Sequence, residues 1–444
     1  MTVAVPPTPF TATVLGLPRI GPNRELHHAV ETYLAGALDA DRLHAAAREL
    51  RLAHLSVLAA AGLDSIPVGT FSYHDQMLDT AALFGALPAR VRDIDDPLDR
   101  YFAAARGTAT HTPLDQAPWF GTGYHHLVPE IDASTRFTLH AENLLAELAE
   151  ARELGVPARP VVIGPLTFLT RARHATGDPL DRLPELIPRY RELLTALADA
   201  GAAWVQLDEP ILGTELTGRE IARLRTTYAA LASTARRPAL LVAIPFGPPG
   251  PALAALADMG IDGVALDFTA GTTLEAVASV PALTRKLVVA GVVDGRDFRR
   301  TDLDAALRTL GSLLGSAGSV AVSSSCSLLH VPYSLSPETA LDERVRSWLA
   351  FGAEKVTEVA VLAGALTRGT DAVAPELAAA RAAVRARPDQ QHDDAPLGVV
   401  TTEHGWVQSS GADCVRPPIP IREAARPVAD SRRFTTPAVR NEVR

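Results

Sequence analysis

Apolar and polar positions along the chain follow two alternating patterns. Short apolar runs rich in Val, Ile and Ala recur between long amphipathic stretches, which is typical of buried parallel strands that alternate with helices. Eight such runs are present, and they begin at Thr13, Ser65, Pro160, Trp204, Leu240, Gly263, Leu287 and Ser319. Eight strand–helix units favour an α/β fold of the (β/α)8 TIM-barrel type, because eight parallel strands close without leaving an edge. A doubly wound open sheet is the alternative, although no glycine-rich dinucleotide fingerprint follows the first strand.

The pattern changes in the last quarter of the chain. Apolar residues at helical spacing predict one helical segment from Leu335 to Arg387, with a start signal at Ser336-Pro337-Glu338. The chain then turns polar, and residues 386–398 are predicted to be a linker. Residues 429–444 are rich in Arg, Ser and Thr without apolar periodicity, and we expect them to form a disordered tail. The barrel is thus expected to carry a polar carboxyl-terminal extension.

Composition and charge narrow the class of protein. The 444 residues carry a formal net charge of -9, and no long Lys/Arg run offers a surface to phosphates, so no nucleic-acid partner is expected. Two cysteines, Cys326 and Cys414, are too few for a disulfide framework and fit a reducing compartment. No apolar run is long enough to span a bilayer, and the amino terminus lacks a leader pattern. We therefore expect a cytoplasmic protein without a membrane partner.

Polar residues at strand ends are the first candidates for chemistry, because functional groups of such barrels lie at the carboxyl ends of the strands. Asp208 and Glu209 end the fourth strand. They are candidates either for an acid or base or for carboxylates that cap a loop. Cys326 and His330 follow the eighth strand, where they form either part of a metal or nucleophile site or a buried polar strand end. Asp75 follows the second strand, and its position is compatible both with a functional role and with capping of the next helix.

The first helix offers a candidate anion site. Arg24-Glu25-Leu26-His27 opens this helix directly after the first strand. Backbone N–H groups and the helix dipole both favour negative charge at a helix amino terminus.

Several ordered segments resemble the cobalamin-independent methionine synthase family. The resemblance covers the chain up to about residue 385, and it lies in LGLPRIGPNREL (Leu15–Leu26), TFSYHDQMLDT (Thr70–Thr80), WFGTGYHHLVPE (Trp119–Glu130), WVQLDEP (Trp204–Pro210), VVAGVVDGR (Val288–Arg296), SSCSLLH (Ser324–His330) and LDERVRSWLAFGAEKV (Leu341–Val356). Many blocks in one order make this resemblance specific.

The resemblance implies a fold and a division of labour. Family members carry two (β/α)8 barrels, and residues 1–385 are similar to the first, which helps to hold the polyglutamate tail of methyltetrahydrofolate. The second barrel of the family binds zinc, homocysteine and the pterin. Residues 399–428 resemble a segment near the start of that second barrel, and we interpret them as a remnant of it. The family's zinc ligands and homocysteine-binding Ile-Gly-Ser have no counterpart in the sequence, so neither a metal site nor a cofactor is assigned to the chain.

The folate-tail positions of the family carry over only in part. The resemblance assigns substrate contacts to Arg24, Glu25, Leu26 and His27, and to Asp413 and Cys414 in the remnant, as two segments of one site. His27 stands where the family has a lysine, Pro118 stands where it has a second lysine, and Asp413 replaces an arginine. All three changes remove positive charge, and they predict weak or altered recognition of an anionic tail.

Three functions are compatible with this sequence. The resemblance implies a 5-methyltetrahydropteroyltriglutamate–homocysteine methyltransferase of methionine biosynthesis, in which catalysis needs a separate catalytic barrel as partner. A non-catalytic paralogue that acts as a binding or assembly module is the alternative. Repurposed chemistry at the mouth of the first barrel, with Asp75, Asp208, Glu209 and His330 as catalytic candidates, is the third.

Overall fold

A seven-stranded parallel sheet forms the centre of the molecule. The computed structural model describes residues 8–174, 177–386, 400–402 and 405–407. In spatial order the strands are β1 (Ile66–Val68), β5 (Ala158–Ile163), β7 (Trp204–Asp208), β8 (Ala239–Ile244), β9 (Gly263–Asp267), β10 (Leu287–Val293) and β11 (Ser319–Ser324). Each neighbouring pair is parallel. These strands lie at seven of the eight positions predicted from the apolar runs.

The first strand predicted in the chain, at Thr13, closes this sheet into a ring. Ala12 pairs in parallel with Val322 of β11, and Thr13 pairs in parallel with Ser65 at the start of β1. The backbone N–H of Thr13 also donates to the carbonyl of Val322 at 3.0 Å. The predicted (β/α)8 TIM-type barrel is therefore confirmed, and the first strand is reduced to two single bridges, one on each side.

The Asp64 carboxylate fixes this short first strand. It accepts hydrogen bonds from the backbone N–H of Thr11 at 2.8 Å and of Ala12 at 2.7 Å, and from the Thr11 hydroxyl at 2.8 Å. A side chain thus supplies the hydrogen bonds that a longer strand would obtain from its neighbours.

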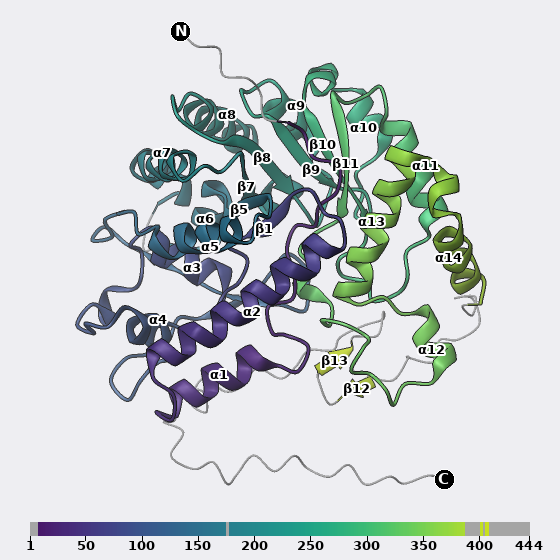
Figure 1. Ribbon diagram of the computed structural model, residues 1–444. Helices are drawn as coiled ribbons and strands as arrows, with labels where there is room; N and C mark the ends of the chain where they lie inside the picture. The colour runs from purple at the N-terminus through teal and green to yellow at the C-terminus, as the bar shows by residue number, and fades with distance from the viewer. Residues whose placement is uncertain (1–7, 175–176, 387–399, 403–404, 408–444) are drawn as a thin grey trace, which may run out of the picture.

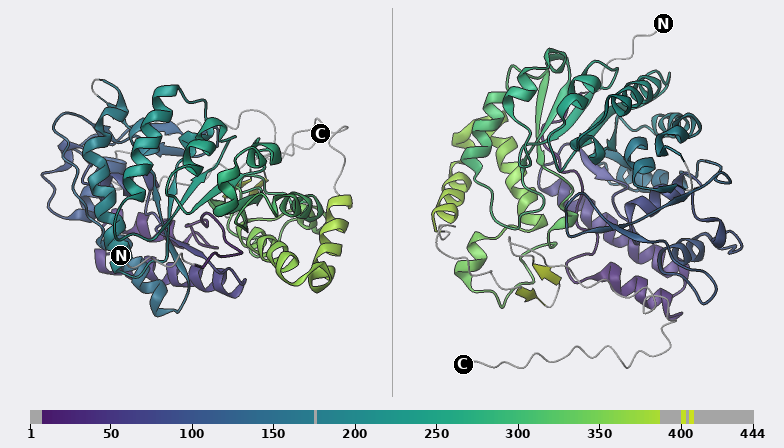
Figure 2. Two further views of the ribbon diagram at one scale, coloured as in Figure 1. Left: turned by 90° about the horizontal axis from the view of Figure 1, so that it is seen from above. Right: turned by 180° about the vertical axis from the view of Figure 1, so that it is seen from behind.

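Helices surround the sheet (Figures 1 and 2). They are α1 (Glu25–Leu34), α2 (Ala40–Ala60), α3 (Gln76–Leu83), α4 (Pro97–Arg106), α5 (Glu142–Glu153), α6 (Pro165–Thr170), α7 (Leu183–Asp199), α8 (Gly218–Ala232), α9 (Gly250–Ala257), α10 (Leu274–Ala278), α11 (Leu303–Leu313), α12 (Glu343–Trp348), α13 (Gly352–Arg368) and α14 (Ala374–Ala386). Side-chain caps begin many of them: Asp75 accepts from the N–H of Leu78 at α3, and Thr217 and Glu220 form a capping box at α8.

Much of the segment from Leu335 to Arg387 is helical, as predicted, but it is divided into three α-helices. The first of them, α12, begins after Asp342, whose carboxylate accepts the N–H of Arg344, and not at the predicted start signal. Extended backbone at Leu349 separates α12 from α13. Gly369, with a φ of 89°, ends α13 in a conformation that no helix continues. Apolar spacing alone did not reveal these breaks.

Three small two-stranded pairings lie outside the barrel. Strands β2 (Gln116–Pro118) and β3 (His125–Leu127) form an antiparallel hairpin, and β4 (Glu130–Ile131) pairs in parallel with β6 (Arg173–His174). Strands β12 (Val400–Thr402) and β13 (Gly405–Val407) are antiparallel and belong to the predicted remnant. The rest of the remnant lies outside the described residues, as do the predicted tail and all but Ala386 of the predicted linker.

Two apolar layers build the core, and a cation lies buried inside the barrel. Aliphatic side chains such as Leu241 and Val289, together with Trp204, fill the inside of the barrel. The larger cluster joins the outer faces of the strands to the helices. Arg159 on β5 is fully buried, and its guanidinium donates to Oε1 of Gln206 at 3.0 Å. Burial lowers the pKa of Arg159 to about 9.

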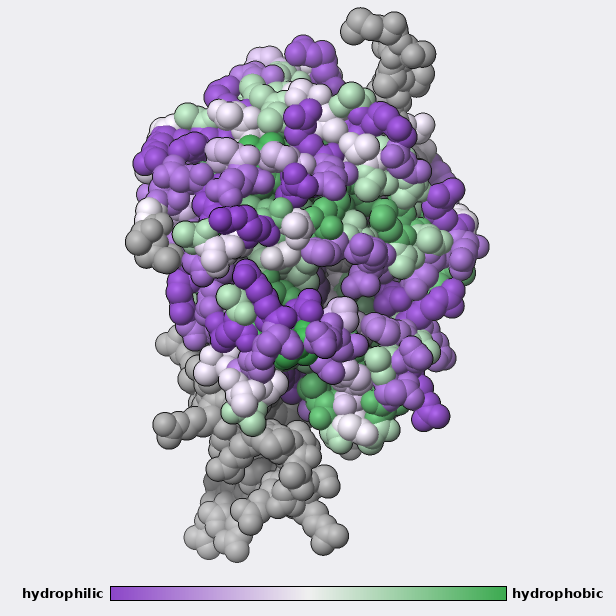
Figure 3. Space-filling view, turned by 90° about the vertical axis from the view of Figure 1, so that its left-hand side faces the viewer, coloured by the Kyte–Doolittle hydropathy of each residue, from purple (hydrophilic) through white to green (hydrophobic). Residues whose placement is uncertain are grey.

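Hydrophilic side chains cover most of the face shown in Figure 3, and hydrophobic groups lie mainly in the recesses between them. Val57, Leu154 and Leu314 are the large hydrophobic side chains of the described residues that are exposed. Within those same residues no helix combines the length and apolar character that a membrane span requires.

Candidate functional site

The start of α1 holds the four positions that the family resemblance assigns to a folate tail. Arg24 immediately precedes the helix with a φ of 63°, and its Nε is buried without a hydrogen-bond partner among the described residues. Glu25 accepts hydrogen bonds from the backbone N–H of Asn23 at 3.0 Å and from its side-chain amide at 2.9 Å. Leu26 is buried and belongs to the core under α1. One cation and one helix amino terminus therefore lie together at this point of the surface.

His27 lies on the same helix but adds little positive charge. Desolvation, followed by repulsion from Arg24, lowers its pKa below the ordinary range of a histidine. Its Nδ1 lies 3.9 Å from a carboxylate oxygen of Glu31, which is too far for a good hydrogen bond. The lowered pKa favours the neutral form of this side chain near pH 7.

Asp75 sits inside a hydrogen-bonded network below the mouth of the barrel. One carboxylate oxygen caps α3 by accepting the Leu78 N–H at 2.9 Å, and the other accepts the Tyr124 hydroxyl at 2.6 Å. Nearby, Asp79 accepts the Tyr101 hydroxyl at 2.7 Å. Burial raises the pKa of Asp75, and it raises the pKa of Asp79 to about 7. Asp75 thus has a capping role, and its remaining oxygen orients Tyr124.

Glu209 is fully buried, and four hydrogen bonds occupy its carboxylate. Oε2 accepts the backbone N–H and the hydroxyl of Thr167, and Oε1 accepts the backbone N–H of Leu166 and the hydroxyl of Tyr228. Burial raises the pKa of this carboxyl to about 7. The arrangement matches a structural carboxylate that holds the first turn of α6, because every bond goes to a group of the scaffold.

Asp208, the neighbouring carboxylate, is partly accessible. Its Oδ1 accepts the side-chain amide of Gln206 at 2.6 Å, and the charge of Arg159 acts on it from inside the barrel. Burial raises the pKa of Asp208 to about 7. It is therefore better placed than Glu209 to exchange a proton near neutral pH.

His330 and Cys326 do not bond to each other. The Cys326 thiol donates to the carbonyl of Ser327 at 3.5 Å, and burial raises its pKa well above the ordinary range. His330 Nε2 is buried without a partner among the described residues, and desolvation lowers the pKa of this histidine to about 3. The four catalytic candidates are also not hydrogen-bonded to one another, and Tyr124 contacts two of them, Asp75 and His330.

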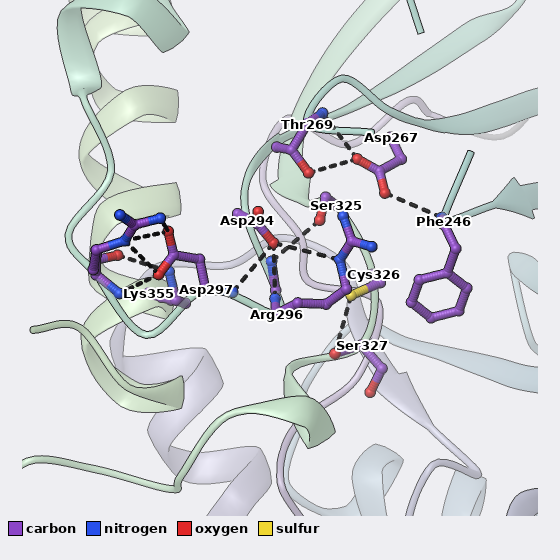
Figure 4. Close-up of polar contacts among 12 residues, drawn as sticks. Phe246, Asp267, Thr269, Asp294, Arg296, Asp297, Ser325, Cys326, Ser327 and Lys355 are labelled. Atoms are coloured by element: carbon purple, nitrogen blue, oxygen red, sulfur yellow. Dashed lines mark hydrogen bonds and ion pairs between the residues drawn. The ribbon is translucent and has the colours of Figure 1, made fainter. Parts of the chain in front are cut away.

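Charged groups that the sequence did not single out gather where β8, β9 and β10 end (Figure 4). Asp267 accepts the backbone N–H of Phe246 at 3.1 Å and both the N–H and the hydroxyl of Thr269. The Arg296 guanidinium lies toward Asp267 and Phe246, with its Nε 3.8 Å from Asp294. Arg296 belongs to the matching block VVAGVVDGR, but only the structure reveals that its side chain faces Phe246.

Zinc, which the family resemblance implies, finds no fitting donor set within the part of the chain that the structure describes. No group of three His, Cys, Asp or Glu side chains there is arranged to hold a metal ion. The buried Cys326 thiol, with its raised pKa, is also a poor source of the thiolate that zinc prefers. Asp413 and Cys414, the two candidate substrate contacts of the remnant, lie outside the described residues.

Comparison with known proteins gives matches over most of the chain. The family model described as cobalamin-independent synthase, N-terminal domain, matches residues 11–318. The 5-methyltetrahydropteroyltriglutamate–homocysteine methyltransferase of Mycobacterium tuberculosis is 59% identical over 389 residues, which is 87% of this chain and 51% of that protein. The protein of the same name from Rhodococcus jostii is 57% identical over 391 residues, or 87% of this chain and 52% of that protein. The chain thus spans about half the length of these relatives.

Solved structures show the same architecture at low sequence identity. A B12-independent methionine synthase from Shewanella aligns with a TM-score of 0.55 and 14% identity, covering 83% of this chain and 98% of that chain. A putative B12-independent methionine synthase from Listeria monocytogenes aligns with a TM-score of 0.54 and 15% identity, covering 81% of this chain and 98% of that chain. At this identity the likeness concerns the fold alone.

Proposed function

Because this chain belongs to the cobalamin-independent methionine synthase family, whose N-terminal domain it carries, we propose that it supplies the first barrel of a 5-methyltetrahydropteroyltriglutamate–homocysteine methyltransferase. The observation that carries the proposal is the 59% identity to curated methyltransferases over 87% of the chain. Those relatives are about twice as long. Methyl transfer then needs a second barrel, to which the resemblance assigns zinc and homocysteine binding.

The contribution proposed for the first barrel is to hold the anionic tail of the folate substrate at the start of α1. Arg24 supplies a guanidinium whose buried Nε has no partner among the described residues. In the first turn of α1 the Leu26 N–H already donates to the Ile20 carbonyl at 3.2 Å, which leaves the N–H groups of Glu25 and His27 for a ligand. Both features favour carboxylates. The site is weaker in charge than the family pattern, because His27 is neutral and Pro118 on β2 carries no charge.

Titration of the purified chain with methyltetrahydropteroyltriglutamate and with the monoglutamate form tests this contribution. We expect the triglutamate form to bind more tightly, and Arg24→Gln to remove the difference. His27→Lys and Pro118→Lys are expected to strengthen triglutamate binding by about 5- to 10-fold each, since each adds a charge near an anion. Arg189→Gln on α7, which breaks only a surface pair with Glu192, is the control. Equal binding of both forms by the wild-type chain would contradict the proposal.

The second test is methyl transfer from methyltetrahydropteroyltriglutamate to homocysteine after mixing the chain with a separately produced catalytic barrel. We expect activity with the mixture that exceeds the activity of the catalytic barrel alone. If the chain binds the triglutamate form but does not raise the activity of any catalytic barrel, the alternative of a non-catalytic binding module is favoured. The charge lost at His27 and Pro118 is the observation on which that alternative rests.

A further inference from the structure

A second cluster of cations and rings lies at the mouth of the barrel, apart from the start of α1. We call Phe120, Phe246, His330, Arg171 and Arg296 the aromatic rim. These residues come from the β2–β3 connection and from the segments that follow β8, β11, α6 and β10. Each side chain is partly accessible to solvent, so the rim can be reached from outside.

Two parallel rings with a cation at each form the centre of the aromatic rim. The Phe120 and Phe246 rings are 6.1 Å apart between centroids, and their planes differ by 13°. The Arg171 guanidinium carbon lies 4.1 Å from the Phe120 centroid, and that of Arg296 lies 5.8 Å from the Phe246 centroid. Cations held over ring faces are attracted by the ring quadrupole, which orients their N–H groups without a carboxylate.

Neither arginine has a close carboxylate partner within the described residues. Arg171 forms no ion pair there, and the nearest carboxylate oxygen to Arg296 is 3.8 Å from its Nε. By contrast, Arg381 on α14 binds Asp304 through two hydrogen bonds of 2.6 and 2.9 Å. The forked donors of both rim arginines thus remain available for a ligand oxygen.

The backbone under both rings is strained. Phe120 has a φ of 43° and Phe246 a φ of 73°, and Arg24 is the one other non-glycine residue of the described chain with a positive φ. The left-handed conformation disfavours a side chain as large as Phe, and surrounding contacts must hold it. For Phe246 the Asp267 carboxylate does so by accepting its backbone N–H. Strain at two residues whose rings stack on each other is typical of a ligand-binding position.

Two buried polar atoms of the aromatic rim lack a partner in the described structure. They are Nε of Arg171 and Nε2 of His330. The His330 ring meets the Phe246 ring edge-on at 5.5 Å, so this nitrogen belongs to the same cluster. Buried polar groups are almost always hydrogen-bonded. The Arg171 Nε–H donor therefore lacks an acceptor, and His330 Nε2, which donates or accepts according to the tautomer, lacks a partner.

We propose that the aromatic rim binds a small aromatic carboxylate, whose anionic group contacts Arg171, Arg296 and His330 while its ring packs against Phe120 and Phe246. A carboxylate fits the planar fork of arginine, and a flat ring fits the stacked phenylalanines. A phosphate would use the cations but leave the rings without a role. This site does not depend on the proposed methyltransferase function, because none of its residues belongs to the α1 site.

Titration of the full chain with benzoate tests the proposal, with benzamide as the neutral analogue of the same shape and inorganic phosphate as the anion without a ring. Trp119 supplies the signal, since its ring meets Phe120 at 4.8 Å and its emission should change on binding. We expect saturable benzoate binding, with benzamide and phosphate each weaker by about 10-fold or more. Absence of benzoate binding, or equal affinity for benzoate and either analogue, would overturn the proposal.

Three rim variants and one control variant complete the test. Arg171→Gln and Arg296→Gln should each weaken benzoate binding by about 10-fold, whereas Arg381→Gln on α14, which breaks only a pair with Asp304 of α11, should leave it unchanged. Phe246→Gly removes the ring but suits the positive φ, so the chain should stay folded and lose benzoate binding. Unchanged affinity in both rim arginine variants would overturn the proposed anion contact.

Discussion

Glu209 accepts two hydrogen bonds from Thr167, one from the backbone N–H at 2.7 Å and one from the hydroxyl at 2.6 Å. The end of β7 is thereby joined to the first turn of α6. A carboxylate that the sequence offers as a catalytic candidate instead fixes the position of a helix. This relationship leads to two predictions about stability.

Glu209→Ala is expected to lower the free energy of unfolding by about 3–5 kcal/mol, because it leaves a cavity and four buried donors without an acceptor. Urea denaturation followed by circular dichroism measures the change. Glu275→Ala on α10 is the control, since this exposed glutamate should contribute less than about 0.5 kcal/mol. A loss of similar size in both variants would contradict a specific role for Glu209.

Gly164→Ala is expected to destabilise the protein by about 1–3 kcal/mol. A Cβ at this position would lie 2.2 Å from the carboxyl carbon of Glu209, so the buried carboxylate would have to move away from Thr167. Gly311→Ala in α11 is the matched control, because a Cβ there meets nothing within 4 Å. The control should stabilise by about 0.5–1 kcal/mol through helix propensity, and the two thermal midpoints should shift in opposite directions.

Asp79→Asn is expected to reduce the loss of stability between about pH 4 and pH 7. Burial raises the pKa of Asp79 from 3.8 to about 7, so the folded state favours the neutral carboxyl. Its stabilising contribution is complete below the unfolded pKa and is lost as the pH rises through the folded pKa. Thermal midpoints of both proteins at several pH values measure the difference. Part of the slope should remain in the variant, because Glu147 and Asp208 are raised in the same way.

Asp64→Ala is expected to loosen the first strand and to lower the free energy of unfolding by about 1–3 kcal/mol, since three donors of Thr11 and Ala12 lose their acceptor. In the variant, backbone hydrogen exchange should accelerate more at residues 11–14 than in β8. Asp258→Ala, which removes a surface pair with Arg225, should change neither quantity appreciably. Unchanged exchange at residues 11–14 would show that the backbone bridges hold the strand without Asp64.

The barrel could be predicted from sequence because buried parallel strands leave a strong local signal. Runs such as LLVAI in β8 and LVVAGVV in β10 are apolar at every position, and each is fully buried. The first strand was found by the same signal, although only Ala12 and Thr13 make bridges. Breaks between helices near Leu349 and Gly369 were missed, since the helical spacing of apolar residues continues on both sides.

The candidate sites could be predicted only as positions along the chain. Asp208 ends β7 and Glu209 follows it directly, whereas Asp75 caps α3 and His330 lies six residues after β11. The partners of the carboxylates come from other parts of the sequence. Glu209, for example, bonds to Thr167, 42 positions earlier. The aromatic rim escaped notice because its signal is spatial: Phe120 and Phe246 are ordinary residues until the fold stacks them on strained backbone.

Closure of the barrel through Ala12 and Thr13 has a consequence for how the chain folds during synthesis. Ala12 meets Val322 across roughly 300 residues of sequence, a contact of very high sequence separation. The ring cannot close until β11 has left the ribosome, so the side of the amino-terminal strand that pairs with β11 must wait as an unpaired sheet edge while most of the protein is made. Nascent chains of this length should therefore depend on chaperones that cover exposed strand edges.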